Sequence, residues 1–110
     1  MYKPKDIVLA PFRYSDRDFY KIRPAVIATS ERYNVTHNHV IAVMITSAQD
    51  SQWPSDILIT PDGGNGLEKP CYLRLKLNSF DVAVINRKIG VLSDGVYERL
   101  KAGFTDALLP

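Results

Sequence analysis

The chain has 110 residues, 14 of them basic and 12 acidic, and its formal net charge is +2. Hydrophobic residues make up 45% and charged residues 24%, which excludes a disordered tail, a collagen-like repeat and a coiled coil and predicts one globular domain over residues 1–110. The single cysteine, Cys71, excludes an internal disulfide and a multi-cysteine zinc site.

Short apolar runs alternate along the chain with turn-rich stretches, which is typical of a mainly β domain. The run at residues 40–45 is apolar throughout and rich in β-branched residues, so we expect a central strand buried on both faces. The predicted strands cover residues 7–10, 25–29, 40–45, 57–60 and 73–77, and residues 82–85 form either a further strand or a short helical turn.

The run at residues 73–77 has the most regular alternation. A period of two points successive side chains to opposite faces of a sheet. We therefore expect the leucines in the core and their neighbours outside: Leu73, Leu75 and Leu77 inside, and Tyr72, Arg74 and Lys76 outside.

The C-terminal segment changes to a helical period. Ser93 or Asp94 is suited to cap the helix, and one face of it would carry Val96, Leu100, Phe104, Ala107 and Leu108. The predicted fold is therefore mainly β (α+β), a small barrel of five to six strands with a C-terminal amphipathic α-helix.

Three features that could carry chemistry have simpler structural explanations. The glycine-rich stretch 61–66 lacks the Lys-Ser ending of a P-loop and no helix follows it, so it predicts a flexible turn. His37 and His39 would face the same way on an extended chain, but a zinc site needs a third ligand, so surface histidines are favoured over a metal or acid–base pair. Cys71 opens a strand, which favours a small buried residue over a nucleophile.

The charge is unevenly distributed along the chain. Residues 1–37 carry a balance of +3, residues 38–67 a balance of −3, and residues 68–90 again +3. Two basic segments around an acidic one could form one basic face that suits an anionic ligand such as nucleic acid, although a solvated surface gives the same pattern. Arg23 directly before a strand could offer its donors to a phosphate, although its spacing alone favours a surface ion pair. Thr46 and Ser47 lie where the central strand reaches the surface, either as a polar strand end or as ligand contacts.

Several short motifs in a fixed order resemble those of the PemK/MazF family of bacterial toxins, the ribonuclease half of type II toxin–antitoxin pairs. They are DIVLAPF at 6–12, RPAVI at 23–27, YN at 33–34, ITS at 45–47, GLEKP at 66–70, RKIG at 87–90 and LS at 92–93. The resemblance runs from about residue 5 to the C-terminal helix. It implies an SH3-like barrel with a C-terminal helix, in agreement with the fold predicted from the residues.

The resemblance also implies a function and its partners. Family members are usually homodimers that cleave single-stranded RNA at short sequence motifs, without a metal or other cofactor, and the C-terminal segment of a cognate antitoxin occupies the RNA groove. Attack by the ribose 2′-OH on the adjacent phosphate would place charge on the phosphate oxygens. Carried over by motif, Arg23 and Thr46 are the expected catalytic residues.

The expected substrate contacts are Tyr14, Lys21, Ser47, Tyr72, Arg74 and Lys76. The aromatic and cationic side chains of the last three suit base stacking and backbone binding, but the same face could instead meet solvent or a second subunit. With no signal peptide and no apolar stretch near about 18 residues, we expect a cytoplasmic protein without membrane contact.

One departure from the family pattern concerns the acidic residue that several members carry on or just after the fifth strand. Here no acid lies between Glu68 and Asp81, so the general base is unassigned. Lys5 replaces a usual glycine, and Cys71 replaces a usual serine. A catalytically weak or inactive member that binds RNA or its antitoxin is the alternative. A CcdB-like toxin that binds gyrase and an SH3-like peptide-binding module are the remaining ones.

Overall fold

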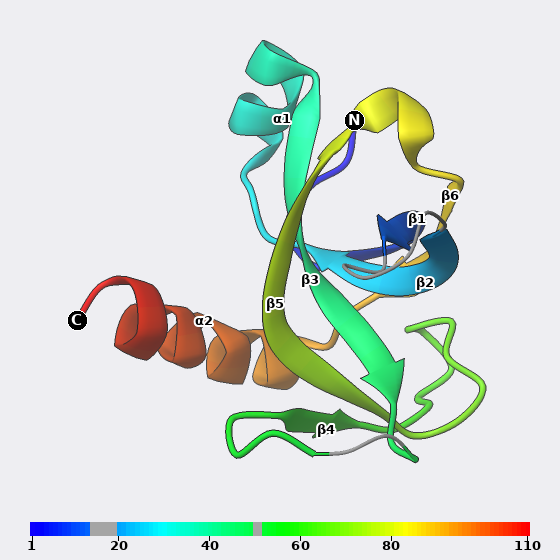
Figure 1. Cartoon of the computed structure of the whole chain (residues 1–110), viewed down its shortest axis with the longest axis vertical. Helices are drawn as coiled ribbons and strands as arrows, with labels where there is room; N and C mark the ends of the chain where they lie inside the picture. The colour runs from blue at the N-terminus through cyan, green and yellow to red at the C-terminus, as the bar shows by residue number, and fades with distance from the viewer. Residues whose placement is uncertain (14–19, 50–51) are drawn as a thin grey trace.

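Six antiparallel strands form one strongly curled sheet with the order β4-β5-β3-β2-β1-β6 (Figure 1). The computed structural model describes residues 1–13, 20–49 and 52–110. The strands are β1 (Asp6–Arg13), β2 (Tyr20–Ile27), β3 (His39–Ser47), β4 (Ile57–Ile59), β5 (Cys71–Asp81) and β6 (Arg87–Val91). The helices are α1 (Glu31–His37), the 3-10 turn η1 (Val82–Val84) and α2 (Asp94–Leu108). The predicted fold, a small barrel with a C-terminal helix, is confirmed.

Each face of the curled sheet carries its own hydrophobic cluster. The cluster beneath α2 consists of Ile7, Val26, Val43, Ile45, Ile59, Cys71, Leu73, Leu92 and Leu100. The cluster inside the curl consists of Val8, Ala10, Phe12, Ala25, Ile27, Val40, Ala42, Phe80 and Ile85. Strand β3 contributes to both clusters, as its uninterrupted apolar sequence predicts.

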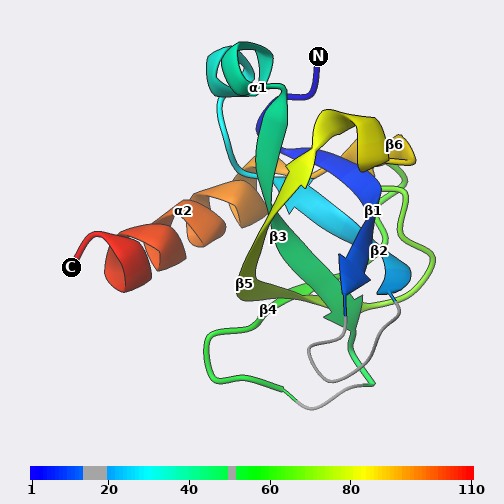
Figure 2. The same ribbon diagram turned by 45° about the horizontal axis from the view of Figure 1, so that its top comes forward.

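Helix α2 begins where the sequence predicts, but its apolar face is only partly used. The Val96 N–H donates to Ser93 Oγ (3.4 Å), so Ser93 is the N-cap. Leu100 is buried, and Val96 and Phe104 pack against the same cluster. Leu108, on the same predicted face, is 54% exposed because the last turns of α2 run past the sheet (Figure 2).

Helix α1 is an element that the sequence analysis missed. Its N-cap Ser30 accepts a hydrogen bond from the Tyr33 N–H (3.1 Å), and it ends at Asn38 in the left-handed conformation. Asn34 is fully buried, and its Nδ2 donates to the Tyr2 carbonyl (2.8 Å). The helix therefore ties the N-terminus to the β2–β3 connection.

Of the two options predicted for residues 82–85, a further strand or a short helical turn, the structure has the turn: η1 covers Val82–Val84 and Ile85 is its C-cap. The sixth strand, β6, follows this turn and pairs with β1 at the edge of the sheet. Lys88 Nζ lies 3.0 Å from Asp6 Oδ1 across this pairing.

The alternation predicted for β5 is interrupted by a register shift against β3. Val43 lies opposite Leu77, but the next residue, Met44, lies opposite Arg74, so Leu75 and Lys76 have no partner in β3. As a result Leu77 is 38% exposed and Arg74 is 8% exposed. The prediction that Leu77 lies inside and Arg74 outside is therefore wrong.

The glycine-rich stretch is a turn packed against β6 rather than a loose loop. Asp62 Oδ1 accepts hydrogen bonds from the N–H groups of Gly64 and Asn65, both at 2.8 Å. The Val91 N–H donates to the Gly64 carbonyl (2.9 Å). Because these amides bind within the protein, this turn is no phosphate cradle.

Candidate functional site

A groove of about 460 Å³ opens at one end of the barrel, where strands β1, β2, β3 and β5 meet. Two of its lining residues connect it to the core: Phe12 belongs to the cluster inside the curl, and Met44 packs against that cluster. The described residues that line it are Phe12, Arg13, Arg23, Met44, Thr46, Lys76, Leu77 and Asn78. Three residues from the sequence prediction, Arg23, Thr46 and Lys76, thus come together in one groove.

The register of the sheet explains why Arg23 and Thr46 share this groove. Strands β2 and β3 pair as far as Ala25 and Met44. Continuing this register by two residues places Arg23 opposite Thr46 on the same face, and Thr46 pairs with Tyr72 on its other side. Pro24, which lacks an N–H, lies where the ladder between β2 and β3 ends.

The groove has a strongly basic lining. Arg13, Arg23 and Lys76 are its charged residues, and no carboxylate occurs among the described residues that line it. These cations come from both basic segments of the sequence, which the fold brings to one face. Thr46 is 5% exposed and Arg23 is half-buried, so both are held by the sheet. Such an arrangement suits a phosphate, which an arginine binds with two parallel N–H donors.

A second hollow of about 550 Å³ continues this groove along the barrel. The two share Arg13 and Asn78. Exposed Tyr20 and Ile22 of β2 line the second hollow. The combined surface offers a path for an extended ligand rather than a pocket for a small one.

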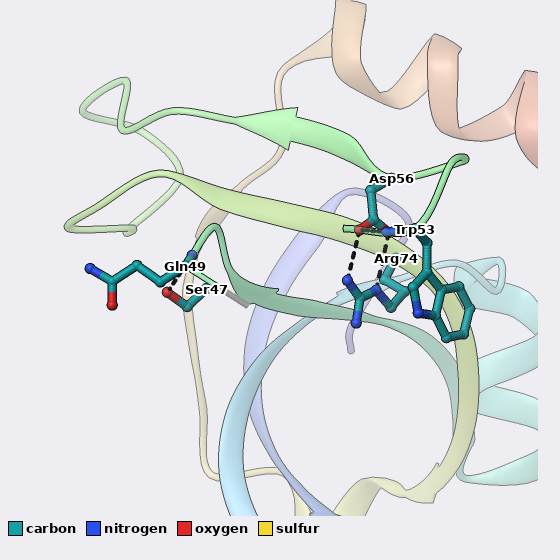
Figure 3. Close-up of polar contacts among 5 residues, drawn as sticks. All are labelled: Ser47, Gln49, Trp53, Asp56 and Arg74. Carbon is teal, nitrogen blue, oxygen red and sulfur yellow. Dashed lines mark hydrogen bonds and ion pairs between the residues drawn. The ribbon is translucent and has the colours of Figure 1, made fainter. Parts of the chain in front are cut away.

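Arg74 is held in an ion pair beside this surface instead of pointing outward as predicted (Figure 3). Its Nε and Nη2 donate to Asp56 Oδ1 (3.1 Å) and Oδ2 (2.7 Å). The Trp53 N–H also donates to Asp56 Oδ2 (2.8 Å), and the guanidinium carbon lies 4.8 Å from the centre of the Trp53 ring. Burial by itself raises the pKa of Asp56, but the hydrogen bonds from Arg74 and Trp53 outweigh it and lower that pKa below its ordinary value.

The remaining predicted substrate contacts are not among the described residues that line the groove. Tyr72 is half-buried in the row that contains Thr46. Lys21 is exposed on β2, opposite Phe12. Ser47 Oγ accepts a hydrogen bond from the Gln49 N–H (3.3 Å; Figure 3). Neither Lys21 nor Ser47 is part of the described groove lining, and Tyr14 lies outside the described residues.

His37, His39 and Cys71 lie apart from the groove. His37 is exposed at the end of α1 and packs against Tyr33, and His39 Nδ1 lies 3.0 Å from the His37 carbonyl oxygen. Across residues 1–13, 20–49 and 52–110, no group of three or more His, Cys, Asp or Glu residues is placed to hold a metal ion. Burial raises the pKa of the Cys71 thiol, which makes it a poor nucleophile.

Sequence reasoning missed several residues of this region. Arg13 and Asn78 line the groove, and Trp53 and Asp56 hold Arg74. A single tryptophan within a polar, proline-containing stretch, SQWPSD at 51–56, was an available signal for Trp53. The others depend on strand register, which the sequence alone does not reveal.

Comparisons with known proteins bear on the family and the fold of the chain. Residues 3–108 match the sequence model of a family described as the PemK-like, MazF-like toxin of type II toxin–antitoxin systems. A comparison with curated protein sequences returned no match.

Solved structures share the fold at low sequence identity. The chain is similar to the toxin MazF-mt6 of Mycobacterium tuberculosis, with 23% identity, a TM-score of 0.73 and coverage of 93% of this chain and 94% of that one. A mycobacterial endoribonuclease in complex with its cognate antitoxin gives 13% identity and a TM-score of 0.77, covering 100% of this chain and 98% of that one. A MazE–MazF structure from Deinococcus radiodurans gives 16% identity and a TM-score of 0.76, with coverage of 97% of this chain and 95% of that one.

Among the helices in the described part of the chain, none is both long and apolar enough to cross a bilayer.

Proposed function

Because the chain belongs to the family of PemK-like, MazF-like toxins of type II toxin–antitoxin systems, we propose that it is an endoribonuclease that cleaves single-stranded RNA at short sequence motifs. The observation that carries this proposal is the meeting of Arg23 and Thr46 in one basic groove. Cleavage of mRNA in the cytoplasm would stop translation and growth, which is the effect expected of a toxin.

The groove suggests how its residues would act on a phosphodiester. The ribose O2′ bonds to the adjacent phosphorus as its proton leaves to a solvent base, and the bond from phosphorus to O5′ breaks. The products are a 2′,3′-cyclic phosphate and a 5′-hydroxyl end, the O5′ oxygen taking its proton from solvent. Arg23 stabilises the charge that develops on the phosphate oxygens, and the Thr46 hydroxyl orients one of them.

The decisive experiment is cleavage of a long single-stranded RNA by the purified protein in EDTA, with analysis of the new ends. Since the attack is internal to the RNA, cleavage is expected to persist without divalent metal. Arg23→Ala and Thr46→Val are each expected to lower the rate by about 10²–10³, the usual effect of losing one preorganised donor. Thr46→Ser, which keeps the hydroxyl, is the matched control and is expected to stay active.

Full cleavage by Arg23→Ala would overturn the residue assignment. A folded protein that binds RNA without cutting it would instead favour a non-catalytic member of the family. The absence of a carboxylate among the described lining residues is the observation that favours this second candidate.

The basic groove also supports binding of a cognate antitoxin. Two similar solved structures are described as complexes of this kind, a mycobacterial endoribonuclease with its cognate antitoxin and MazE–MazF. In the proposed system, the C-terminal segment of the antitoxin occupies the groove through acidic side chains that meet Arg13, Arg23 and Lys76. Such a peptide is expected to compete with RNA.

An apolar groove of about 390 Å³ beside α2 supports the expectation of a homodimer. Leu77, Leu108 and Leu109 in it are exposed, which is unusual for leucines that lie together. Its full lining is Ala28, Thr29, Ile41, Leu77, Phe104, Leu108 and Leu109. In the proposed toxin, this surface is covered by a second copy of the chain.

A further inference from the structure

Trp53 is held in place by contacts to both its backbone and its ring. Its N–H donates to Asp56 Oδ2 (2.8 Å), and its carbonyl accepts the Asp56 N–H (3.0 Å). The Asp56 carboxylate in turn fixes the Arg74 guanidinium, which lies 4.8 Å from the centre of the indole ring (Figure 3). The ring is therefore anchored to β5 through two side chains that are themselves almost fully buried.

This anchored ring remains open to solvent. Trp53 is 39% exposed, although a tryptophan gains more from burial than most residues. It belongs to neither of the two hydrophobic clusters. The core therefore does not account for the ion pair and the backbone contacts that hold it.

The ring also lies next to the basic groove. Lys76 lines that groove and places its Nζ 6.0 Å from the centre of the Trp53 ring. Arg74, which contacts the same ring, lies opposite Met44, and Met44 lines the same groove. An RNA strand whose phosphate meets Lys76 would bring a neighbouring base within reach of the indole.

We propose that Trp53 is a stacking platform for a nucleobase of the bound RNA, placed by the Asp56–Arg74 ion pair beside the phosphate-binding cations. This inference rests on the proposed function, because it takes RNA as the ligand of the groove. Stacking on an aromatic face is available to every base, so Trp53 supplies affinity and position rather than a base-specific hydrogen bond. Trp53 touches substrate in this arrangement but takes no part in the bond-breaking step.

The single tryptophan of the chain makes the test direct, because all indole emission comes from Trp53. A short 2′-deoxy oligonucleotide of mixed sequence lacks the attacking hydroxyl and binds without being cut. It is titrated into the protein while indole fluorescence is followed, and binding is measured in parallel by the anisotropy of a labelled copy. Saturable quenching is expected with this oligonucleotide. An abasic strand of the same length is expected to bind more weakly and to leave the emission unchanged.

Variants separate stacking from folding. Trp53→Ala is expected to weaken oligonucleotide binding about 5- to 150-fold, the usual effect of losing one stacked base. Trp53→Phe keeps an aromatic face and is expected to retain most of the affinity. Leu58→Ala removes another exposed apolar side chain, on β4, and serves as the matched control with unchanged binding. Circular dichroism and thermal unfolding confirm that each variant is folded.

Two results would overturn the inference while leaving the proposed function in place. One is RNA cleavage and oligonucleotide binding by the wild-type protein without quenching. The other is equal binding by folded Trp53→Ala and wild type, which would also be the result if Trp53 served a protein partner instead. Failure of the wild-type protein both to bind the oligonucleotide and to cleave RNA would overturn the proposed function and this inference together.

Discussion

The Arg74–Asp56 ion pair places two charges almost out of contact with water. Their side chains are 10% and 0% exposed, respectively. Removing one partner of such a pair leaves the other charge buried without compensation, which costs about 3–5 kcal/mol. Both partners are therefore needed to hold the β3–β4 segment and the ring of Trp53 against β5.

The lowered pKa of Asp56 predicts how stability depends on pH. Because its pKa is lower in the folded protein than in the unfolded chain, the ion pair contributes fully above the unfolded value of about 3.9, and the contribution is lost as pH falls through the folded pKa. Urea unfolding between pH 7 and pH 3 is expected to show a steep loss of stability in acid. Asp56→Asn is expected to be less stable by about 3 kcal/mol at pH 7 and to lose less on acidification.

Asp94→Asn is the matched control for this experiment. Asp94 likewise forms an ion pair, with Lys5, but the Asp94 side chain is 88% exposed. Because solvent screens this pair, it contributes little to the stability of the protein. The stability of Asp94→Asn is expected to fall with decreasing pH in parallel with that of the wild-type protein. If the Asp56→Asn curve ran parallel to wild type as well, the buried ion pair would not be the source of the acid sensitivity.

The packed glycine turn makes a prediction at the scale of an element. Gly66 has a φ of 73°, and a Cβ there would collide with the carbonyl of Ile89 in β6. Gly66→Ala is expected to lower the free energy of unfolding by about 3 kcal/mol, from backbone strain and overpacking together. Gly63 has a similar φ of 82° but open space around its Cβ position, so Gly63→Ala is expected to cost only about 1 kcal/mol.

Thermal and urea unfolding of the two glycine variants measure this difference. Similar decreases in the free energy of unfolding for both variants would show that only backbone strain matters. The contact between the turn and β6 would then accommodate the added methyl group.

The elements that sequence reasoning recovered are those set by local pattern. The apolar run of β3 and the Ser93 cap of α2 depend on neighbouring residues, and both are confirmed. The exposed Leu77 and the buried Arg74 were predicted wrongly because the two-residue shift between β3 and β5 is a property of the pair of strands. The ion-pair partner of Arg74 lies 18 residues away in the sequence, where no local pattern points to it.

At the scale of the whole molecule, the same reasoning selected three residues that the fold brings into one groove, Arg23, Thr46 and Lys76. Arg23 and Thr46 were selected through the family resemblance, which the match over residues 3–108 confirms, and their role in catalysis stays a prediction. Their position opposite one another follows from the β2–β3 register, which the sequence alone does not predict. The charge balance of the segments indicated a basic face. That Arg13 and Lys76 line the same groove depends on the fold.

The apolar groove beside α2 predicts the oligomeric state. Leu108→Glu places a charge in that groove and is expected to convert a dimer to a monomer, because a buried unpaired charge is not tolerated in an interface. Sedimentation velocity measures the change. Ala107→Glu, exposed on the same helix but not part of the groove, is the control and is expected to leave the dimer intact. A monomeric wild-type protein at the same concentrations would contradict the proposal.

The pairing of β1 with β6 has a consequence for synthesis on the ribosome. Strand β1 cannot complete its pairing until β6 has been synthesised. Ile7 pairs with Gly90, and the Leu92 N–H donates to the Lys5 carbonyl. At about 5–20 residues per second, translation of the chain between them takes several seconds. Until then β1, which carries Arg13 into the groove, lacks one of its two neighbours. A nascent chain is thus expected to lack a finished groove until β6 has been synthesised.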